Sequence, residues 1–597
     1  MKKAKKEAKQ ETIIEDRQPE ERRSIISDFN WLIGCAVITL ISVFWRFWQL
    51  ELKPLHHDEG VNSFFLMTLF REGTYKYDPA NYHGPDLYYL ALAFSKMFGL
   101  NTISIRGSVA IFGVLTVVLA FFLKDYLGKI GSLAAALFLA LSPGMVYISR
   151  YFIHEILFVF FSFGIVVGVL YFIEKRKAGI WAITTMTLLL LICFLPTALN
   201  VATLIAADNE SLIWMLRLGL FAVEAILVFL IMRMILAWND GAPIYLLLAT
   251  ASAVMLFATK ETAFITIGTL FLAVISVWLW RKIYGAMVGK TEADEIEPVE
   301  LTWTIFRERL GDNSDIALIA IACICVFAYV GILFFSSFFT YPEGVKKALE
   351  AYAIWTKTGS KEHVQNGMWA YVEWGMQVEA PIMLLSLAGT VLALVKPKSK
   401  FVMFAGLWAW GLFAAYTIIP YKTPWLAISF LMPMCIPAGY LVGELISMKE
   451  KAVRAIGLII AVAATVVLTY QTYALNFVHY DDEDQPYVYA HTKREFLELM
   501  EKINYYAEKS GKGNQAGIQI VSPDYWPMVW YVKDYSKAYF HGKIVPADNA
   551  EMIVAKTPDQ EIDVMRQYSG QYQLVGTYGL RPGVDLMLLV RSDLADK

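Results

Sequence analysis

The stretch WLIGCAVITLISVFWRFWQLELKPLHHDEG, residues 31–60, determines how the rest of the chain is interpreted. Its first part, residues 31–50, is almost entirely apolar and has the length that crosses a bilayer as a helix. This run is too long for a signal-peptide core and lacks a small-residue cleavage pattern, so it predicts an uncleaved membrane helix. Four titratable residues follow, just where the chain would leave the lipid: His56, His57, Asp58 and Glu59.

The composition of the whole chain agrees with a membrane protein. Of its 597 residues, 57% are hydrophobic and 18% are charged, and the mean hydropathy is +0.48. Soluble domains are roughly 45–50% apolar and about 25% charged, so lipid must solvate part of this chain. The formal net charge of −2 and the lack of a basic face predict no nucleic-acid partner. All five cysteines lie in apolar runs, without the spacing of a zinc site or a disulfide framework.

The apolar runs predict a polytopic α-helical membrane protein with about 13 transmembrane helices. The expected spans are 30–50, 103–123, 130–148, 153–173, 180–200, 212–237, 242–260, 262–280, 315–335, 381–396, 401–420, 424–446 and 455–476. With the N-terminus inside, every cluster of Lys and Arg between spans falls on the cytoplasmic side. We therefore expect a multi-pass protein of the plasma membrane with its C-terminal segment outside the cytoplasm.

Three domains follow from this pattern. Residues 1–29 form a polar cytoplasmic tail, residues 30–476 the transmembrane domain, and residues 477–597 a small extracytoplasmic α/β domain. The transmembrane domain has two long outer loops, 51–102 and 336–380. Within the first loop, 60–71 and 85–98 are expected to form short amphipathic helices in the interface. In the last domain, strands are expected at 517–522, 537–540, 551–555, 572–578 and 585–591, and helices at 493–508 and 558–568.

Residues that can do chemistry gather in the outer loops. Beside the first acidic pair stand His83 and Asp86 in NYHGPDLYY, Arg150, His154 and Glu155 in SRYFIHEILF, Lys260 and Glu261 in FATKETAF, and Lys422 in PYKTPW. A single acid at a helix end is usually a solvated boundary residue, and a Lys–Glu pair can simply close a helical hairpin. Charged groups at membrane depth are costly and usually functional. Carboxylates and cations on one outer face suit a lipid-borne phosphate leaving group and a base that deprotonates the incoming nucleophile.

These motifs, in this order, resemble the GT-C superfamily of membrane glycosyltransferases. They are similar to glycosyltransferase family 39, the branch of protein O-mannosyltransferases and aminoarabinose transferase, and most of all to its prokaryotic flippase-activity-associated subfamily. The resemblance rests on HHDEG (56–60), YHGPDLYY (82–89), TKETAFI (259–265), PYKTPW (420–425) and YWPMVWYVKDY (525–535). It implies a polyprenyl-phosphate-linked sugar donor, a catalytic carboxylate in the first outer loop, and transfer with inversion outside the cytoplasm.

The resemblance also assigns roles to individual residues. Asp58 falls on the catalytic aspartate of the family and Glu59 on its acidic neighbour. Arg150 and Lys422 fall where the family binds donor phosphate, and we expect Lys260 to be a further cation for it. Acceptor-binding or orienting roles are expected for His57, His83, His154 and Glu155, the last of which stands where relatives often carry Asp. The chain departs from the family in having His57 directly before Asp58 and HGPD where many relatives have H-P-P-L. The acceptor class, whether protein, lipid or growing glycan, stays open.

Two further points stay open in the sequence. His57, Asp58, His83 and Glu155 suit a divalent metal such as zinc or manganese, yet no His pair at helical i, i+4 spacing supports one, and no cofactor is required. The aromatic segment 522–535 is either a platform for a sugar or a packing element. A lipid-linked sugar flippase is the main rival function, although transporters usually hold charge near the midplane and show internal repeats. An inactive relative that serves as a scaffold in glycan export is the other rival.

Overall fold

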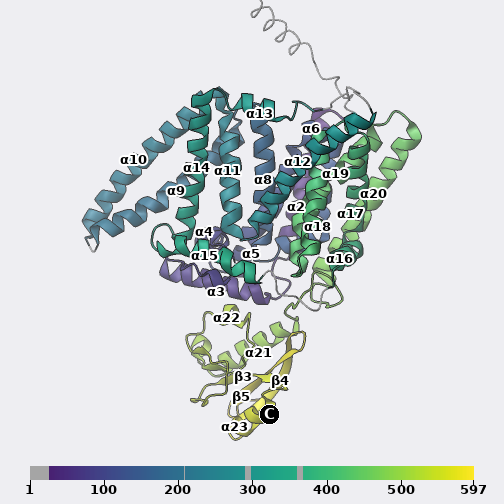
Figure 1. The fold of residues 1–597 in the computed structure, drawn as a ribbon. Helices are drawn as coiled ribbons and strands as arrows, with labels where there is room; N and C mark the ends of the chain where they lie inside the picture. Colours follow the sequence, from purple (N-terminus) through teal and green to yellow (C-terminus); the bar gives the residue numbers. More distant parts are fainter. Residues whose placement is uncertain (1–25, 82, 208, 289–296, 359–366, 597) are drawn as a thin grey trace, which may run out of the picture.

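The computed structural model describes residues 26–81, 83–207, 209–288, 297–358 and 367–596 of the chain. Figure 1 shows a bundle of long helices with a small sheet domain attached at one end. We call the end of the bundle that carries the sheet domain the site end. Short helices α3 (His57–Glu72), α4 (Asp86–Phe98) and α15 (Glu343–Thr358) lie across this end (Figure 1). The two interfacial helices expected at 60–71 and 85–98 are therefore found as α3 and α4.

Among the described residues, ten helices are long and apolar enough to cross a membrane. They are α2 (Asp28–Phe47), α5 (Thr102–Phe121), α8 (Glu155–Ile173), α9 (Ile180–Ala206), α10 (Glu210–Ala237), α12 (Ala263–Val288), α14 (Asn313–Phe335), α18 (Lys400–Ile418), α19 (Ile428–Ser447, preceded by the 3-10 turn η3, Pro424–Ala427) and α20 (Lys451–Tyr473, continued by the π-helix η4, Ala474–Val478). The count rises to 12 when each of two bent pairs is one span.

The bent pairs and one short helix account for the other expected spans. Helix α6 (Lys124–Leu141) meets α7 (Pro143–Ser149) at 58°, and α16 (Ala370–Val378) meets α17 (Ala380–Val395) at 108°. Helix α11 (Pro243–Thr259) has 17 residues, fewer than the ~20 that a full crossing needs. The fold class is thus confirmed with 10 to 12 spans. The one expected span that is not among them, 242–260, corresponds to the shorter helix α11.

Helix α19 forms the centre of the bundle. Of its span, 94% is buried within the protein, against 17% or less for α9, α10, α14 and α20. It packs closely on α6, because a Cβ added at Gly439 would lie 2.6 Å from the backbone of Ala135 and Gly131. Small residues of this kind let membrane helices approach. The remaining short elements are η1 (Pro79–Asn81), η2 (Asn239–Gly241), α13 (Trp303–Arg309), η5 (Gly513–Gln515) and α22 (Met528–Tyr531).

The C-terminal domain is a five-stranded sheet in the order β2-β1-β3-β5-β4. Strand β1 (Ile518–Ile520) runs parallel to β2 (Ala538–Phe540) and β3 (Met552–Thr557), and β5 (Val584–Arg591) runs antiparallel to β3 and to β4 (Tyr572–Arg581). Alternate residues of the strands pack on α21 (Glu495–Lys509) and on α23 (Glu561–Tyr568). Side chains alternate between the faces of a strand, so one helix covers each face. The expected C-terminal α/β fold is confirmed.

Candidate active site

The motif HHDE forms the first turn of α3, and His56 caps this helix. Its Nδ1 accepts the backbone N–H of Asp58 at 3.0 Å, and the backbone N–H of His56 donates to Oε2 of Glu59 at 3.0 Å. This reciprocal pair is a capping box, which satisfies donors that a helix start leaves free. The other ring nitrogen, Nε2, lies 3.0 Å from the carbonyl oxygen of Tyr489. Burial lowers the pKa of His56 to about 4, so the ring is neutral at physiological pH.

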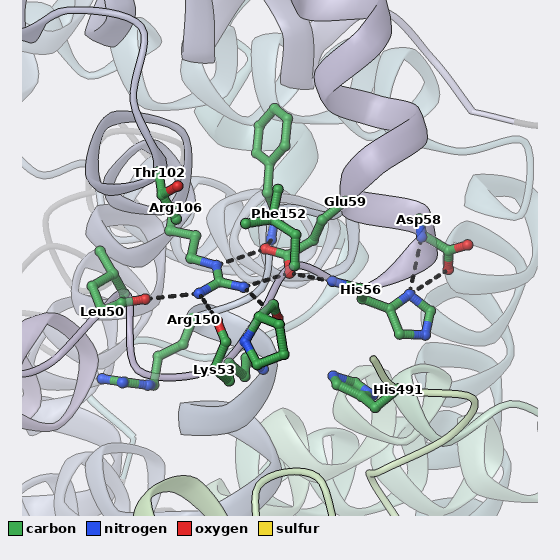
Figure 2. A network of polar contacts seen from close by, with 12 residues as sticks. Leu50, Lys53, His56, Asp58, Glu59, Thr102, Arg106, Arg150, Phe152 and His491 are labelled. Carbon is green, nitrogen blue, oxygen red and sulfur yellow. Dashed lines mark hydrogen bonds and ion pairs between the residues drawn. The ribbon is translucent and has the colours of Figure 1, made fainter. Parts of the chain in front are cut away.

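Glu59 is held in a buried ion pair with Arg106 of α5 (Figure 2). The guanidinium donates to both carboxylate oxygens at 2.8 and 2.7 Å, and the N–H of Phe152 donates to Oε1 at 2.8 Å. Burial alone would raise the pKa of Glu59, but Arg106 and these donors hold it below its usual value. Both oxygens are thus occupied. This geometry gives Glu59 a structural role, and the catalytic role expected for it does not enter the function proposed below.

Asp58 points the other way. Figure 2 shows its side chain turned away from the Glu59–Arg106 pair, beyond the ring of His56. The side chain keeps 43% of its accessible surface. The pKa of Asp58 is raised to about 6, mainly by burial; His57 and Lys260 oppose this shift, and the nearby carboxylates of Glu155 and Glu59 add to it. Asp58 is therefore accessible, lies in the electrostatic field of Glu155 and Lys260, and has a pKa raised toward neutral pH.

Glu155 and Lys260 form a second ion pair on the side of Asp58. Lysine Nζ lies 2.7 Å from Oε1 of Glu155, and both side chains are less than a tenth exposed. Lys260 also pairs through its backbone with His83 as an isolated β-bridge. The loop around His83 fits there because residue 84 is glycine: a Cβ at Gly84 would lie 1.7 Å from the carbonyl oxygen of Ala258. The structure thus brings together groups that the sequence placed in three separate loops.

The other expected histidines also lie at this end. The rings of His83 and His154 are 4.7 Å apart between centroids, and Nε2 of His154 lies 3.0 Å from the carbonyl oxygen of Gly84. His57 lies beside the C-terminal domain, with Nδ1 3.5 Å from the guanidinium of Arg581. Burial lowers the pKa of His57 and of His154, so neither ring carries a fixed positive charge.

Arg150 and Lys422, the other two cations expected to hold phosphate, contact helix ends. Arg150 donates to the carbonyl oxygens of Trp48 at 2.6 Å and Gln49 at 2.7 Å, just past α2, and lies across the network from Asp58 (Figure 2). Nζ of Lys422 donates to the carbonyl oxygens of Thr417 and Ile419 at 2.8 and 2.7 Å, at the end of α18. Cations favour helix C-termini because carbonyls there lack partners. A phosphate would have to draw either cation from these oxygens.

No metal centre appears in the part of the chain that the structure describes. No three His, Cys, Asp or Glu side chains among those residues converge as ligands, so His57, Asp58, His83 and Glu155 do not form the metal site considered above.

Two arginines at this end, Arg106 and Arg581, were not expected from the sequence. Arg106 could have been found, because a charge inside an apolar span signals a buried partner. Arg581 gave no signal, since its strand lies more than 500 residues beyond the motif it contacts.

The helical bundle, with charged residues gathered at one end, has the fold of the solved ArnT structures described below. Residues 80–206, which include His83, Arg106 and Glu155, match the family model "Dolichyl-phosphate-mannose-protein mannosyltransferase". A comparison with curated protein sequences finds no match.

Two solved structures share the fold. Both are of ArnT from Cupriavidus metallidurans. The chain is 12% identical to the form bound to undecaprenyl phosphate, with a TM-score of 0.53 over 96% of this chain and 100% of that one. The apo form is also 12% identical, with a TM-score of 0.54 over 95% of this chain and 99% of that one.

Proposed function

We propose that the chain transfers a sugar from a polyprenyl-phosphate donor to an acceptor hydroxyl, with Asp58 as general base. The observation that carries this proposal is the division of labour in the acidic pair. Both carboxylate oxygens of Glu59 are engaged in the ion pair with Arg106. Asp58, in contrast, is accessible, has its pKa raised to about 6 and lies near a buried Glu155–Lys260 pair. The family matched by residues 80–206 is named for a lipid-phosphate sugar donor, and ArnT, which shares the fold, was solved with undecaprenyl phosphate.

The chemistry requires one base and a stabilised leaving group. Asp58 takes the proton of the acceptor hydroxyl while its oxygen attacks the anomeric carbon. The bond from that carbon to the phosphate oxygen breaks on the opposite face, and the phosphate departs with the electron pair. A single displacement of this kind inverts the anomeric configuration. Lys260 is the expected phosphate cation whose charge acts on Asp58, so we assign it the developing negative charge. Glu155 holds the Lys260 ammonium in place.

This chemistry favours a site at the lipid–water boundary on the outer side of the plasma membrane. The donor tail stays in lipid while the acceptor, a protein, lipid or glycan, arrives from water. The Lys and Arg clusters between spans support a cytoplasmic N-terminus. The C-terminal domain would then stand outside the cytoplasm, above the site.

The test is transfer by the purified full chain in nanodiscs. Synthetic polyprenyl-phosphate mannose, glucose and aminoarabinose serve as donors, and release of polyprenyl phosphate is measured with and without acceptor extract. Asp58→Asn should abolish release at unchanged yield and with a melting temperature no lower than that of the parent. Asp563→Asn, an exposed aspartate on α23 paired with Arg566, should leave release intact. Normal turnover of Asp58→Asn would refute the assignment. Scrambling of the sugar lipid in liposomes without release would instead favour the flippase.

A further inference from the structure

Both histidines before Asp58 are held by the C-terminal part of the chain. The ring of His56 touches the segment between α20 and the sheet domain: Nε2 lies 3.0 Å from the carbonyl oxygen of Tyr489, and the ring centroid lies 4.6 Å from that of His491. The ring of His57 touches the sheet domain itself. Its Nδ1 is 3.5 Å from Arg581 of β4, and its centroid is 6.3 Å from Trp526. Segments more than 400 residues apart in sequence therefore meet around Asp58.

The contacts of His56 use both ring nitrogens. Nδ1 accepts the N–H of Asp58, so the ring proton sits on Nε2 and is donated to the carbonyl of Tyr489. A neutral imidazole has one donor and one acceptor, and here each has a fixed partner. The ring of Tyr151 packs edge-on at 5.0 Å between centroids. Any shift of the Tyr489 carbonyl would therefore turn the ring and move the backbone of Asp58.

The contact of His57 is braced in a similar way. The guanidinium of Arg581 forms an ion pair with Asp524, and Lys556 lies 3.1 Å from the same carboxylate. This array fixes the direction in which Arg581 donates to Nδ1 of His57. The domain is also anchored close by, since the hydroxyl of Tyr531 accepts the N–H of Leu55 at 2.8 Å. The sheet domain thus reaches the catalytic motif through rigid contacts.

We infer that the linker and the C-terminal domain position Asp58 through His56 and His57, and so belong to the catalytic unit. The inference rests on the proposed role of Asp58. His56 and His57 act as positioning residues that do not touch the substrate. The C-terminal domain then affects the rate of the chemical step, which is different from admitting the acceptor.

Substitutions of His56 separate its two contacts. In His56→Asn the shorter side chain can still accept the N–H of Asp58, as asparagine does at helix starts, but cannot reach Tyr489. In His56→Gln the longer amide can reach Tyr489 but caps poorly. Each variant should lower kcat at least ten-fold, with the KM for donor within two-fold, while the chain still unfolds in a single cooperative transition. His541→Asn, an exposed histidine of the sheet domain, is the matched control and should behave as the parent.

Arg581 supplies the second arm of the test. Arg581→Ala should lower kcat, Arg581→Lys should recover part of the loss, and Arg566→Ala on exposed α23 should have no effect. A higher acceptor KM at unchanged kcat in Arg581→Ala would overturn the inference, because the domain would then control access. Parental kcat in both His56 variants would also overturn it. In either case Asp58→Asn stays inactive if the proposed function holds, so the two failures are distinguishable.

Discussion

Glu59→Gln should destabilise the folded chain far more than Asp58→Asn, although the two acids are adjacent. Glu59 and Arg106 are both fully buried, and the guanidinium contacts both carboxylate oxygens. Removing one partner of a buried ion pair leaves an uncompensated charge and costs about 3–5 kcal/mol. Glutamine keeps one side-chain oxygen that can accept the N–H of Phe152, so the loss of unfolding free energy should not exceed this range.

The measurement is unfolding of the purified chain in detergent, followed by intrinsic fluorescence, with transfer assayed in parallel. Glu498→Gln, an exposed glutamate of α21, should change the unfolding free energy by no more than about 0.5 kcal/mol. The double variant Glu59→Gln/Arg106→Met removes both charges and should be at least as stable as Glu59→Gln alone. If Glu59→Gln unfolds like the parent but loses transfer, Glu59 takes part in the chemistry and the structural reading of the ion pair is wrong.

Three further predictions concern residues at the site. The value of kcat/KM should rise with pH through about 6, because Asp58 must be ionised and its pKa is raised to about 6; a pH–rate profile that is flat from pH 5 to 8 would contradict this. A raised acid pKa also means that ionised Asp58 opposes folding, so Asp58→Asn should be at least as stable as the parent above pH 6. Below pH 4, where Asp58 is protonated, this advantage of the variant in unfolding free energy should disappear. Gly84→Ala should destabilise the chain by about 1–3 kcal/mol through overpacking, because its Cβ would meet the carbonyl oxygen of Ala258 at 1.7 Å. Gly268→Ala in α12 is the control and should not destabilise the chain, because a Cβ there meets nothing within 4 Å. Equal melting temperatures of the two variants would refute this prediction.

The elements were largely predictable because apolar length and alternation are local properties of the sequence. Each expected membrane span coincides with a helix, and each expected strand of the last domain is present. The count of spans was less secure because length alone decides it: α11 has 17 residues, and the bundle contains two sharp bends. One bend is capped by the other, since Glu379 accepts the N–H of Gly144 at 2.7 Å. No local pattern announces such a contact.

The site was predictable only in part, for a geometric reason. Asp58, Glu155 and Lys260 lie at the same end of the bundle because their loops leave it there, which the order of spans fixes. The sequence cannot say which charges serve the structure. Adjacent residues on a helix point about 100° apart, so Asp58 and Glu59 could not share one task. Arg150 and Lys422 sit just past helix ends, where unpaired carbonyls attract cations. The resemblance assigned Asp58, Glu59, Arg150 and Lys422 to one site, and the directions of their side chains separate them.

The aromatic segment 522–535 shows why the alternatives for it could not be decided from sequence. Its second half is a packing element: Trp530 donates through Nε1 to Thr102 at 3.1 Å, and Tyr531 accepts from Leu55. Its first half reaches the rim of the site, where Trp526 lies against His57 and Asp524 holds Arg581. The packing half therefore fixes the rim half beside His57. Removing the hydrogen bond from Trp530 to Thr102, as in Trp530→Phe, should weaken the contact between the C-terminal domain and the bundle. We expect this variant to lower kcat through His56 and His57, the histidines that the C-terminal part of the chain holds.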